Sequence, residues 1–224
     1  MVIENSLVLL FDVDNTLLDN DRFASDLGAR LEQLLGSDAR ERYFVLFAAL
    51  REQLGYADYL TALQQLRAEL ADNMTVLQLS MFLLEYPFAE RLYPQALAAV
   101  EHLSTLGQTV VLSDGDAIFQ PRKIQHAGIW DAFAARVLIY MHKERKLDVM
   151  QRAYPADHYV MIDDKPNLLA AMKRIMHNQL TTVFVRQGHY ARDADMATIE
   201  PAPDLTINSI KDLLGLPAAA FRLT

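Results

Sequence analysis

The chain has 224 residues, 52% of them hydrophobic and 22% charged, which is enough for one large domain or for a core domain with a smaller second one. Its formal net charge of -8 argues against nucleic acid as the main partner, because phosphate backbones bind to basic surfaces. The absence of cysteine excludes disulfides, thiolate metal sites and a cysteine nucleophile. No apolar run is long enough to cross a bilayer and no cationic leader precedes the first one, so we expect a cytoplasmic protein without a membrane partner.

The first distinctive stretch is the apolar run 6–10, followed closely by Asp12-Val13-Asp14-Asn15-Thr16. The run has the length of a buried strand, so two carboxylates follow its carboxyl end, where open α/β sheets bind ligands. Carboxylates this close repel each other unless a cation or a shared proton relieves them. Asp and Asn also favour turns, so an isolated motif of this kind would be explained equally well by a turn.

Between residues 20 and 90 the hydrophobic pattern is helical throughout. Leucines and aromatic residues recur at three- and four-residue spacing, as in amphipathic helices that share a core. Gly36 and Gly55 stand where two of these helices could end. We expect residues 20–90 to form a smaller all-helical domain, inserted into a core domain of residues 1–19 and 91–224.

From residue 95 onward, strand-like and helix-like segments alternate, which predicts an α/β fold with a doubly wound parallel sheet. The expected strands are residues 109–113, 136–140, 159–162, 181–185 and 204–207. The expected helices are residues 95–106, 117–128, 146–153, 166–176 and 209–214.

Polar side chains follow three of the expected strands, and the carboxyl ends of parallel strands share one edge of a sheet. These residues are Asp12 and Asp14, Ser113 and Asp114, and Asp163 and Asp164. Several carboxylates in one pocket need a cation, and oxygen ligands alone favour Mg²⁺ over Ca²⁺ or zinc. Asp114 and the nearby Asp116 either cap a loop or position a polar group of the substrate.

The motifs resemble those of the haloacid dehalogenase superfamily, hydrolases with an aspartate nucleophile. Asp12-Val13-Asp14-Asn15-Thr16 matches the first motif, Ser113 at the end of an apolar strand matches the second, and Asp163-Asp164 matches the fourth. The third motif is a lysine, either Lys143 or Lys146, without the Lys-Pro pair common in the family. The helical insert is similar to the cap of the subclass with an early helical cap.

The resemblance implies a Mg²⁺-dependent phosphatase of a small phosphorylated metabolite, working through an aspartyl-phosphate. Asp12 would be the nucleophile, and Asp14 would protonate the leaving alcohol and then deprotonate the attacking water. Ser113 would hydrogen-bond a phosphoryl oxygen. The metal would be bound by Asp12, by the backbone carbonyl of Asp14 and by Asp164. Asp163 would bind the metal through a water molecule or would support the residues that bind it.

Asp14 distinguishes between reactions in this family. Dehalogenases and phosphonate-cleaving members resemble the fold but lack the second aspartate, since a halide leaves without a proton. An alkoxide leaving group needs that acid, so Asp14 favours hydrolysis of a phosphate ester. A phosphotransferase or mutase with the same chemistry, and a non-catalytic binding or regulatory protein, stay open.

For the active-site lysine we favour Lys143, which follows the expected strand within a loop. Lys146 would begin the next helix beside Arg145, where a solvated position is commoner. Lys143, with Ser113 and Asp114, would then contact the substrate. In the helical insert, the candidates for contact with a second anionic group are Arg22, Arg30 and Arg51. We expect a monomer or a homodimer.

Overall fold

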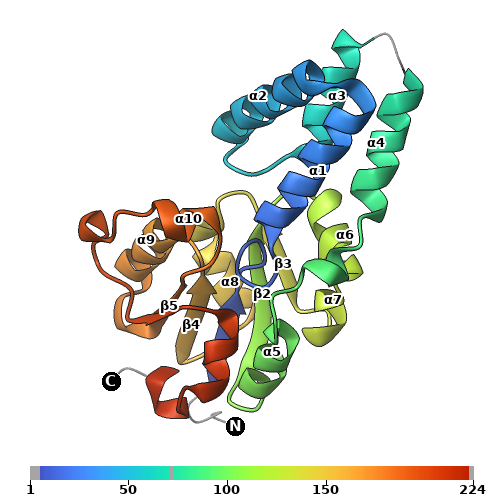
Figure 1. Cartoon of the computed structure of the whole chain (residues 1–224). Coiled ribbons are helices and arrows are strands. Elements are labelled where there is room, and N and C mark those ends of the chain that lie inside the picture. The colour runs from blue at the N-terminus through green and yellow to red at the C-terminus, as the bar shows by residue number, and fades with distance from the viewer. Residues whose placement is uncertain (1–5, 71–72, 222–224) are drawn as a thin grey trace.

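The computed structural model describes residues 6–70 and 73–221. Six parallel strands form one sheet in the order β3-β2-β1-β4-β5-β6, with helices on both faces (Figure 1). The strands are β1 (Leu7–Phe11), β2 (Gln108–Asp114), β3 (Val137–Tyr140), β4 (His158–Asp163), β5 (Leu180–Val185) and β6 (Leu205–Ile207). This arrangement confirms the doubly wound α/β fold expected from the sequence. Among the described helices, none has the length and apolar character needed to cross a membrane.

The central strand β1 is buried on both faces, as its uninterrupted apolar run predicts. Its last residue, Phe11, pairs with Val111 of β2 and with Ile162 of β4. The polar residues that follow these three strands therefore reach the same edge of the sheet.

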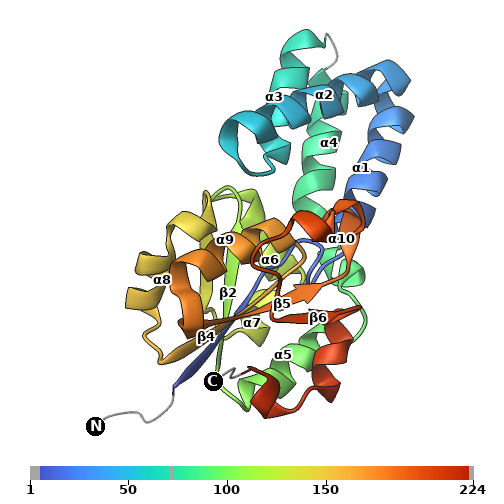
Figure 2. The ribbon, with the colours of Figure 1, turned by 90° about the vertical axis from the view of Figure 1, so that its left-hand side faces the viewer.

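Two helical layers cover the sheet (Figure 2). One face packs against α8 (Leu147–Ala153) and α9 (Pro166–Met176). The other face packs against α5 (Ala96–Ser104), α7 (Ile129–Ala132) and the 3-10 helix η5 (Ile210–Gly215). The remaining core helices are α6 (Phe119–His126) and α10 (Gly188–Asp193), with short 3-10 turns η1 (Phe88–Arg91), η2 (Lys143–Arg145), η3 (His177–Gln179), η4 (Met196–Thr198) and η6 (Ala218–Phe221).

The insert between β1 and β2 consists of four helices that lie above the carboxyl edge of the sheet (Figure 1). They are α1 (Asn20–Leu35), α2 (Ser37–Leu54), α3 (Tyr59–Glu69) and α4 (Asn73–Glu85). Asp19 and Asp58 cap α1 and α3 by accepting backbone N–H groups, which is a common way to begin a helix. Gly55 ends α2 with a φ of 82°, in the left-handed region that favours glycine. That this insert is a separate domain, with a boundary near residue 90, stays a prediction.

An aromatic cluster joins the insert to the core. Phe23 of α1 packs against Tyr59, Tyr86, Phe88 and Phe119, with ring centroids 4.8 to 5.9 Å apart. The hydrophobic cores of the insert and of one face of the sheet are therefore continuous. Contacts of this kind stabilise the insert in its position over the sheet edge.

Two expected helices differ from the structure. The helix expected at 117–128 is α6, which begins at Phe119 after a turn in which the Asp116 carboxylate accepts the backbone N–H groups of Ile118 and Phe119. The segment expected as a helix at 209–214 is the 3-10 helix η5, which starts with a capping box of Ser209 and Asp212.

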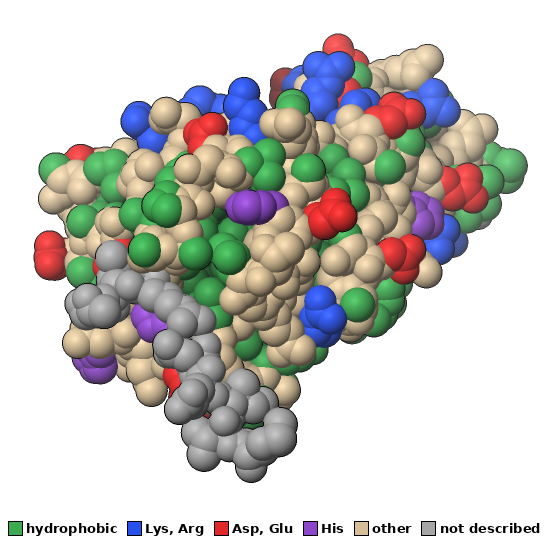
Figure 3. Space-filling model, turned by 90° about the horizontal axis from the view of Figure 1, so that it is seen from below, with side chains coloured by type: hydrophobic (Ala, Val, Ile, Leu, Met, Phe, Trp, Pro, Cys, Tyr) green, Lys and Arg blue, Asp and Glu red, His purple; other side chains and the backbone are tan. Residues whose placement is uncertain are grey.

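Seen from below, on the side away from the insert, the surface shows acidic and basic side chains scattered among hydrophobic ones (Figure 3). The chemistry-bearing side chains predicted from the sequence belong to the opposite edge of the sheet, beneath the insert.

Candidate active site

Three buried carboxylates meet at the carboxyl edge of the sheet. Asp12 follows β1, Asp163 ends β4, and Asp164 begins the loop into α9. One oxygen of each lies within 4.8 Å of the others. The structure therefore brings together three of the four aspartates that the sequence proposed as metal ligands.

Lys143 lies inside this group and is fully buried. Its Nζ donates to Asp12 Oδ1 at 2.6 Å and to Asp163 Oδ2 at 2.7 Å. Burial opposes the charge of the lysine, but Asp12 and Asp163 raise its pKa well above the usual value, so it is an ammonium. Lys146 is exposed and contacts none of these carboxylates.

The Lys143 side chain enters the site because the chain turns sharply after β3. His142 adopts a φ of 58°, and the short 3-10 turn η2 follows it. The Asp114 carboxylate accepts the backbone N–H of Lys143 at 2.7 Å. Asp114 thus fixes the loop that positions the lysine, and its side chain also lines the cavity described below.

Asp164 shows that this group of side chains fits a cation. Both of its carboxylate oxygens are buried, and neither has a hydrogen-bond partner among the described residues. Burial, with the charges of Asp163 and Asp12, raises the pKa of Asp164 to about 9. A buried carboxylate without a donor is costly, and a bound cation would remove that cost. The donor set consists only of oxygens, which suits a hard ion such as Mg²⁺.

Asp14 lies beside this group but is held by different partners. Its carboxylate accepts from Lys123 Nζ at 2.8 and 3.0 Å, and from Gln120 Nε2 at 3.4 Å. The same Gln120 amide donates to Ser113 Oγ at 3.0 Å. Two residues of α6 therefore position both the expected proton donor and the expected phosphoryl-binding hydroxyl.

Lys123 was not identified from the sequence. It is only 1% exposed, and its Nζ also donates to Asn20 Oδ1. The nitrogen lies 5.5 to 5.9 Å from the ring centroids of Phe23, Tyr59, Phe88 and Phe119. A cation in such an aromatic environment gains from the ring quadrupoles. The available signal was the spacing of Gln120 and Lys123, three apart on one helix face, but polar residues at this spacing are usually solvated.

The loop after Asp14 is fixed by Asn15, which adopts a φ of 61°. Its side-chain oxygen accepts the backbone N–H groups of Asn20 and Asp21 at the start of α1. A Cβ at Gly188 would lie 2.4 Å from that of Asn15, so only glycine permits this approach of α10.

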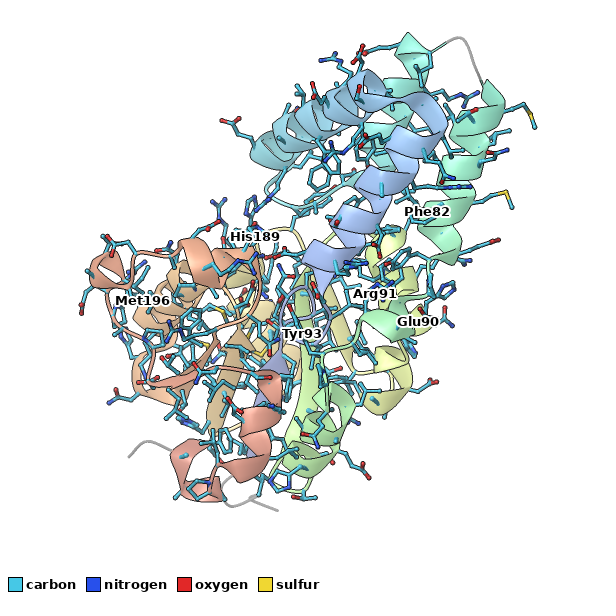
Figure 4. The ribbon with its side chains drawn as sticks, viewed as in Figure 1. Phe82, Glu90, Arg91, Tyr93, His189 and Met196 are labelled. Carbon is cyan, nitrogen blue, oxygen red and sulfur yellow. The ribbon has the colours of Figure 1, made fainter. Side chains whose placement is uncertain are left out.

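Asp21 connects the insert to α10. Its carboxylate contacts His189 Nδ1 at 2.6 Å and Arg192 at 3.0 Å, and Figure 4 shows His189 at the junction with α1. Burial opposes the charge of Asp21, yet the hydrogen bonds from His189 and Asn15 lower its pKa below the ordinary value. Asp21 is therefore a charged contact between insert and core.

A cavity of about 420 Å³ lies between the insert and the sheet edge. Asp14 and Asp114 line it from the core, and Arg51 and Tyr59 from the insert. Of the three arginines considered from the sequence, only Arg51 lines this cavity: Arg22 pairs with Asp26, and Arg30 donates to Gln33. The volume is within the roughly 300–1,000 Å³ typical of small-molecule sites.

Several solved protein structures are similar to this one over nearly the whole chain. A 2.20 Å crystal structure of a haloacid dehalogenase-like hydrolase from Burkholderia xenovorans LB400 is 50% identical, with a TM-score of 0.90 and coverage of 96% of this chain and 98% of that one. L-2-haloacid dehalogenase from Xanthobacter autotrophicus shares the fold at 18% identity, with a TM-score of 0.58 and coverage of 92% and 96%. The HAD-hydrolase YfnB from Bacillus subtilis, in a structure bound to magnesium, also shares the fold. It is 17% identical, with a TM-score of 0.63 and coverage of 95% of this chain and 98% of that one.

No curated protein sequence matches the chain. The family model for haloacid dehalogenase-like hydrolases matches residues 7–175, which run from β1 to the last turn of α9 and include the whole insert. Together with the site geometry, this match shows that the protein is a member of the haloacid dehalogenase-like hydrolase family.

Proposed function

We propose that this hydrolase is a Mg²⁺-dependent phosphatase that acts on a small phosphate ester through an aspartyl-phosphate. The observation that carries the proposal is the position of Asp14. Its carboxylate is held by Lys123 and Gln120 on the cavity side of the site, next to Ser113. A proton donor held there serves an alkoxide leaving group, whereas a halide would not need one.

In the proposed reaction an Asp12 oxygen forms a bond to phosphorus while the bond from phosphorus to the substrate oxygen breaks. Asp14 gives its proton to that leaving oxygen. A water molecule then attacks the phosphorus of the aspartyl-phosphate and passes a proton to Asp14, which frees Asp12 and inorganic phosphate. Each half-reaction therefore restores the protonation state that the other one needs.

Charge in the transition state is balanced by the surrounding groups. Lys143 lies against Asp12, so its ammonium is placed to stabilise the phosphoryl oxygens. Asp12, Asp163 and Asp164 would hold a Mg²⁺ ion, which would supply further neutralisation of those oxygens. The Ser113 hydroxyl is available as one more donor.

The insert closes the site from above. A Cβ at Gly55 would lie 2.0 Å from the His142 ring, so the end of α2 touches the loop that carries Lys143. Asp21 supplies the second contact, through His189. We expect these contacts to limit the access of water to the aspartyl-phosphate.

The first test is phosphate release from p-nitrophenyl phosphate with and without Mg²⁺, beside chloride release from 2-chloropropionate. We expect phosphate release that stops when a chelator removes the metal, since buried carboxylates then lose the cation that lets them coexist with a phosphoryl group. We expect no chloride release above the uncatalysed rate. Chloride release without phosphate release, or full phosphatase activity of the metal-free protein, would contradict the proposal.

Lys123→Met provides a second test, of how Asp14 is positioned. The methionine fills the aromatic surroundings but removes the ammonium that makes two hydrogen bonds to Asp14. We expect kcat for an alkyl phosphate such as glycerol 3-phosphate to fall about 10- to 100-fold, the usual contribution of a general acid at its lower end. The loss for p-nitrophenyl phosphate should be smaller, because that leaving group needs less protonation.

Lys211→Met is the matched control, since Lys211 is exposed on η5, which packs beside α5 on one face of the sheet, and it does not line the cavity. It should leave both rates unchanged. An equal loss on both substrates in Lys123→Met would assign Lys123 a structural role only.

A further inference from the structure

Two cationic side chains of the cavity have no carboxylate partner among the described residues. They are Arg51, at the end of α2, and Lys165, just before α9. Both are partly buried, so the surrounding water screens their charges only in part. Asp12, Asp163 and Asp164 lie near enough to Lys165 to provide counter-charge for it, so Arg51 is the cation that lacks one. A half-buried charge without a counter-ion is uncommon in a folded protein and points to a ligand.

The carboxylates of the cavity are already engaged elsewhere. Asp14 pairs with Lys123, and Asp21 pairs with His189 and Arg192. Asp114 accepts the backbone N–H of Lys143. None of these three carboxylates forms a direct ion pair with Arg51.

Arg51 and Lys165 meet at one aromatic ring. The guanidinium carbon of Arg51 and the Nζ of Lys165 each lie 5.0 Å from the ring centroid of Tyr190 on α10. An anion bound beside Tyr190 could therefore contact Arg51 and would lie near the positive charge of Lys165. The Tyr190 ring holds the planar guanidinium in place, so less side-chain entropy is lost when an anion binds.

The Arg51 end of the cavity adjoins a second hollow. Arg51, Lys165 and Tyr190 also line a neighbouring hollow of about 350 Å³ that includes His142 but not Asp14. The Glu144 carboxylate in that hollow contacts Arg145 at 3.5 Å. The phosphoryl group attacked by Asp12 has Lys143 beside it, so Arg51 is free to contact a different part of the substrate.

We propose that Arg51 forms a second anion-binding subsite, so that the substrate is a phosphate ester that also carries a carboxylate or a second phosphate group. This inference rests on the phosphatase function proposed above. Arg51 presents the planar fork of donors that suits either anion, and Tyr190 fixes the orientation of that fork. Phe44 and Phe47 of the insert line the cavity as well and would contact the carbon skeleton of the substrate.

The experiment compares kcat/KM for substrates that differ only in the second group. At three carbons the pair is glycerol 3-phosphate and 3-phosphoglycerate. At six carbons glucitol 6-phosphate is compared with 6-phosphogluconate, and glucose 6-phosphate with glucose 1,6-bisphosphate, so that a carboxylate and a second phosphate are tested separately. We expect wild-type protein to prefer a doubly anionic substrate by about tenfold or more in at least one set, as one charged contact would produce.

Arg51→Met should remove that preference mainly through a higher KM, since the lost contact is present in the ground state as well as in the transition state. The loss of kcat/KM for the substrate with the second anionic group should exceed the loss for its counterpart without that group by about fivefold or more. Arg30→Met removes the same charge from α1 outside the cavity and should leave the preference intact.

The outcomes separate the subsite from the function on which it rests. If wild-type protein hydrolyses esters with and without the second anionic group at equal rates, this result by itself overturns the subsite but not the phosphatase function. A proportional loss on both substrates in Arg51→Met would make Arg51 a structural contact to Tyr190 and would also overturn it. Failure to hydrolyse any phosphate ester, p-nitrophenyl phosphate included, would overturn the phosphatase function and the subsite together.

Discussion

Asp12→Asn should abolish turnover of every phosphate ester while the protein stays folded. The amide has nearly the same shape as the carboxylate, but its oxygen is a poor nucleophile and cannot form the acyl phosphate. Lys143 keeps Asp163 as a partner in the variant, so the buried ammonium is not left unpaired. We expect kcat to fall by about 1,000-fold or more, roughly 4 kcal/mol of barrier.

Acid quenching during turnover gives a second measurement for this prediction. Wild-type protein should retain label from a phosphate-labelled substrate as an acyl phosphate, and Asp12→Asn should retain none. Asp148→Asn is the matched control, because that aspartate is exposed and forms a surface ion pair with Arg152. Residual activity of Asp12→Asn within about tenfold of wild type would assign the attack to another group.

Lys143→Ala should lower kcat/KM by about 30- to 1,000-fold, the usual effect of removing one charged contact to a transition state. Without the ammonium, Asp12 and Asp163 repel each other and an approaching phosphoryl group. Lys146→Ala should stay within about twofold of wild type, because Lys146 is exposed and away from the carboxylates.

Removing Lys143 also leaves two buried carboxylates without their cation, so the variant is expected to unfold at a lower temperature. Its activity should therefore be measured below the onset of unfolding, followed by circular dichroism. Loss of activity in Lys146→Ala with normal activity in Lys143→Ala would reverse the assignment of the two lysines.

The sequence by itself determined the sheet and which carboxylates meet at its edge. The apolar runs before Asp12, Ser113 and Asp163 are long enough to be buried strands, and parallel strands necessarily present their carboxyl ends on one edge. The helical insert was equally evident, because its hydrophobic period changes from that of strands to that of helices. Local patterns of this kind depend on neighbours in the chain.

The tertiary structure alone decided which residues support those carboxylates. Lys123 is separated from Asp14 by 109 positions, and its buried position is favourable because it pairs with Asp14 inside the packed rings of Phe23, Phe88 and Phe119. The choice of Lys143 over Lys146 depended on the tight turn at His142, and the choice of Arg51 over Arg22 and Arg30 depended on how α2 meets α10. These contacts join segments far apart in the chain, and their energies come from burial and charge pairing that no local pattern records.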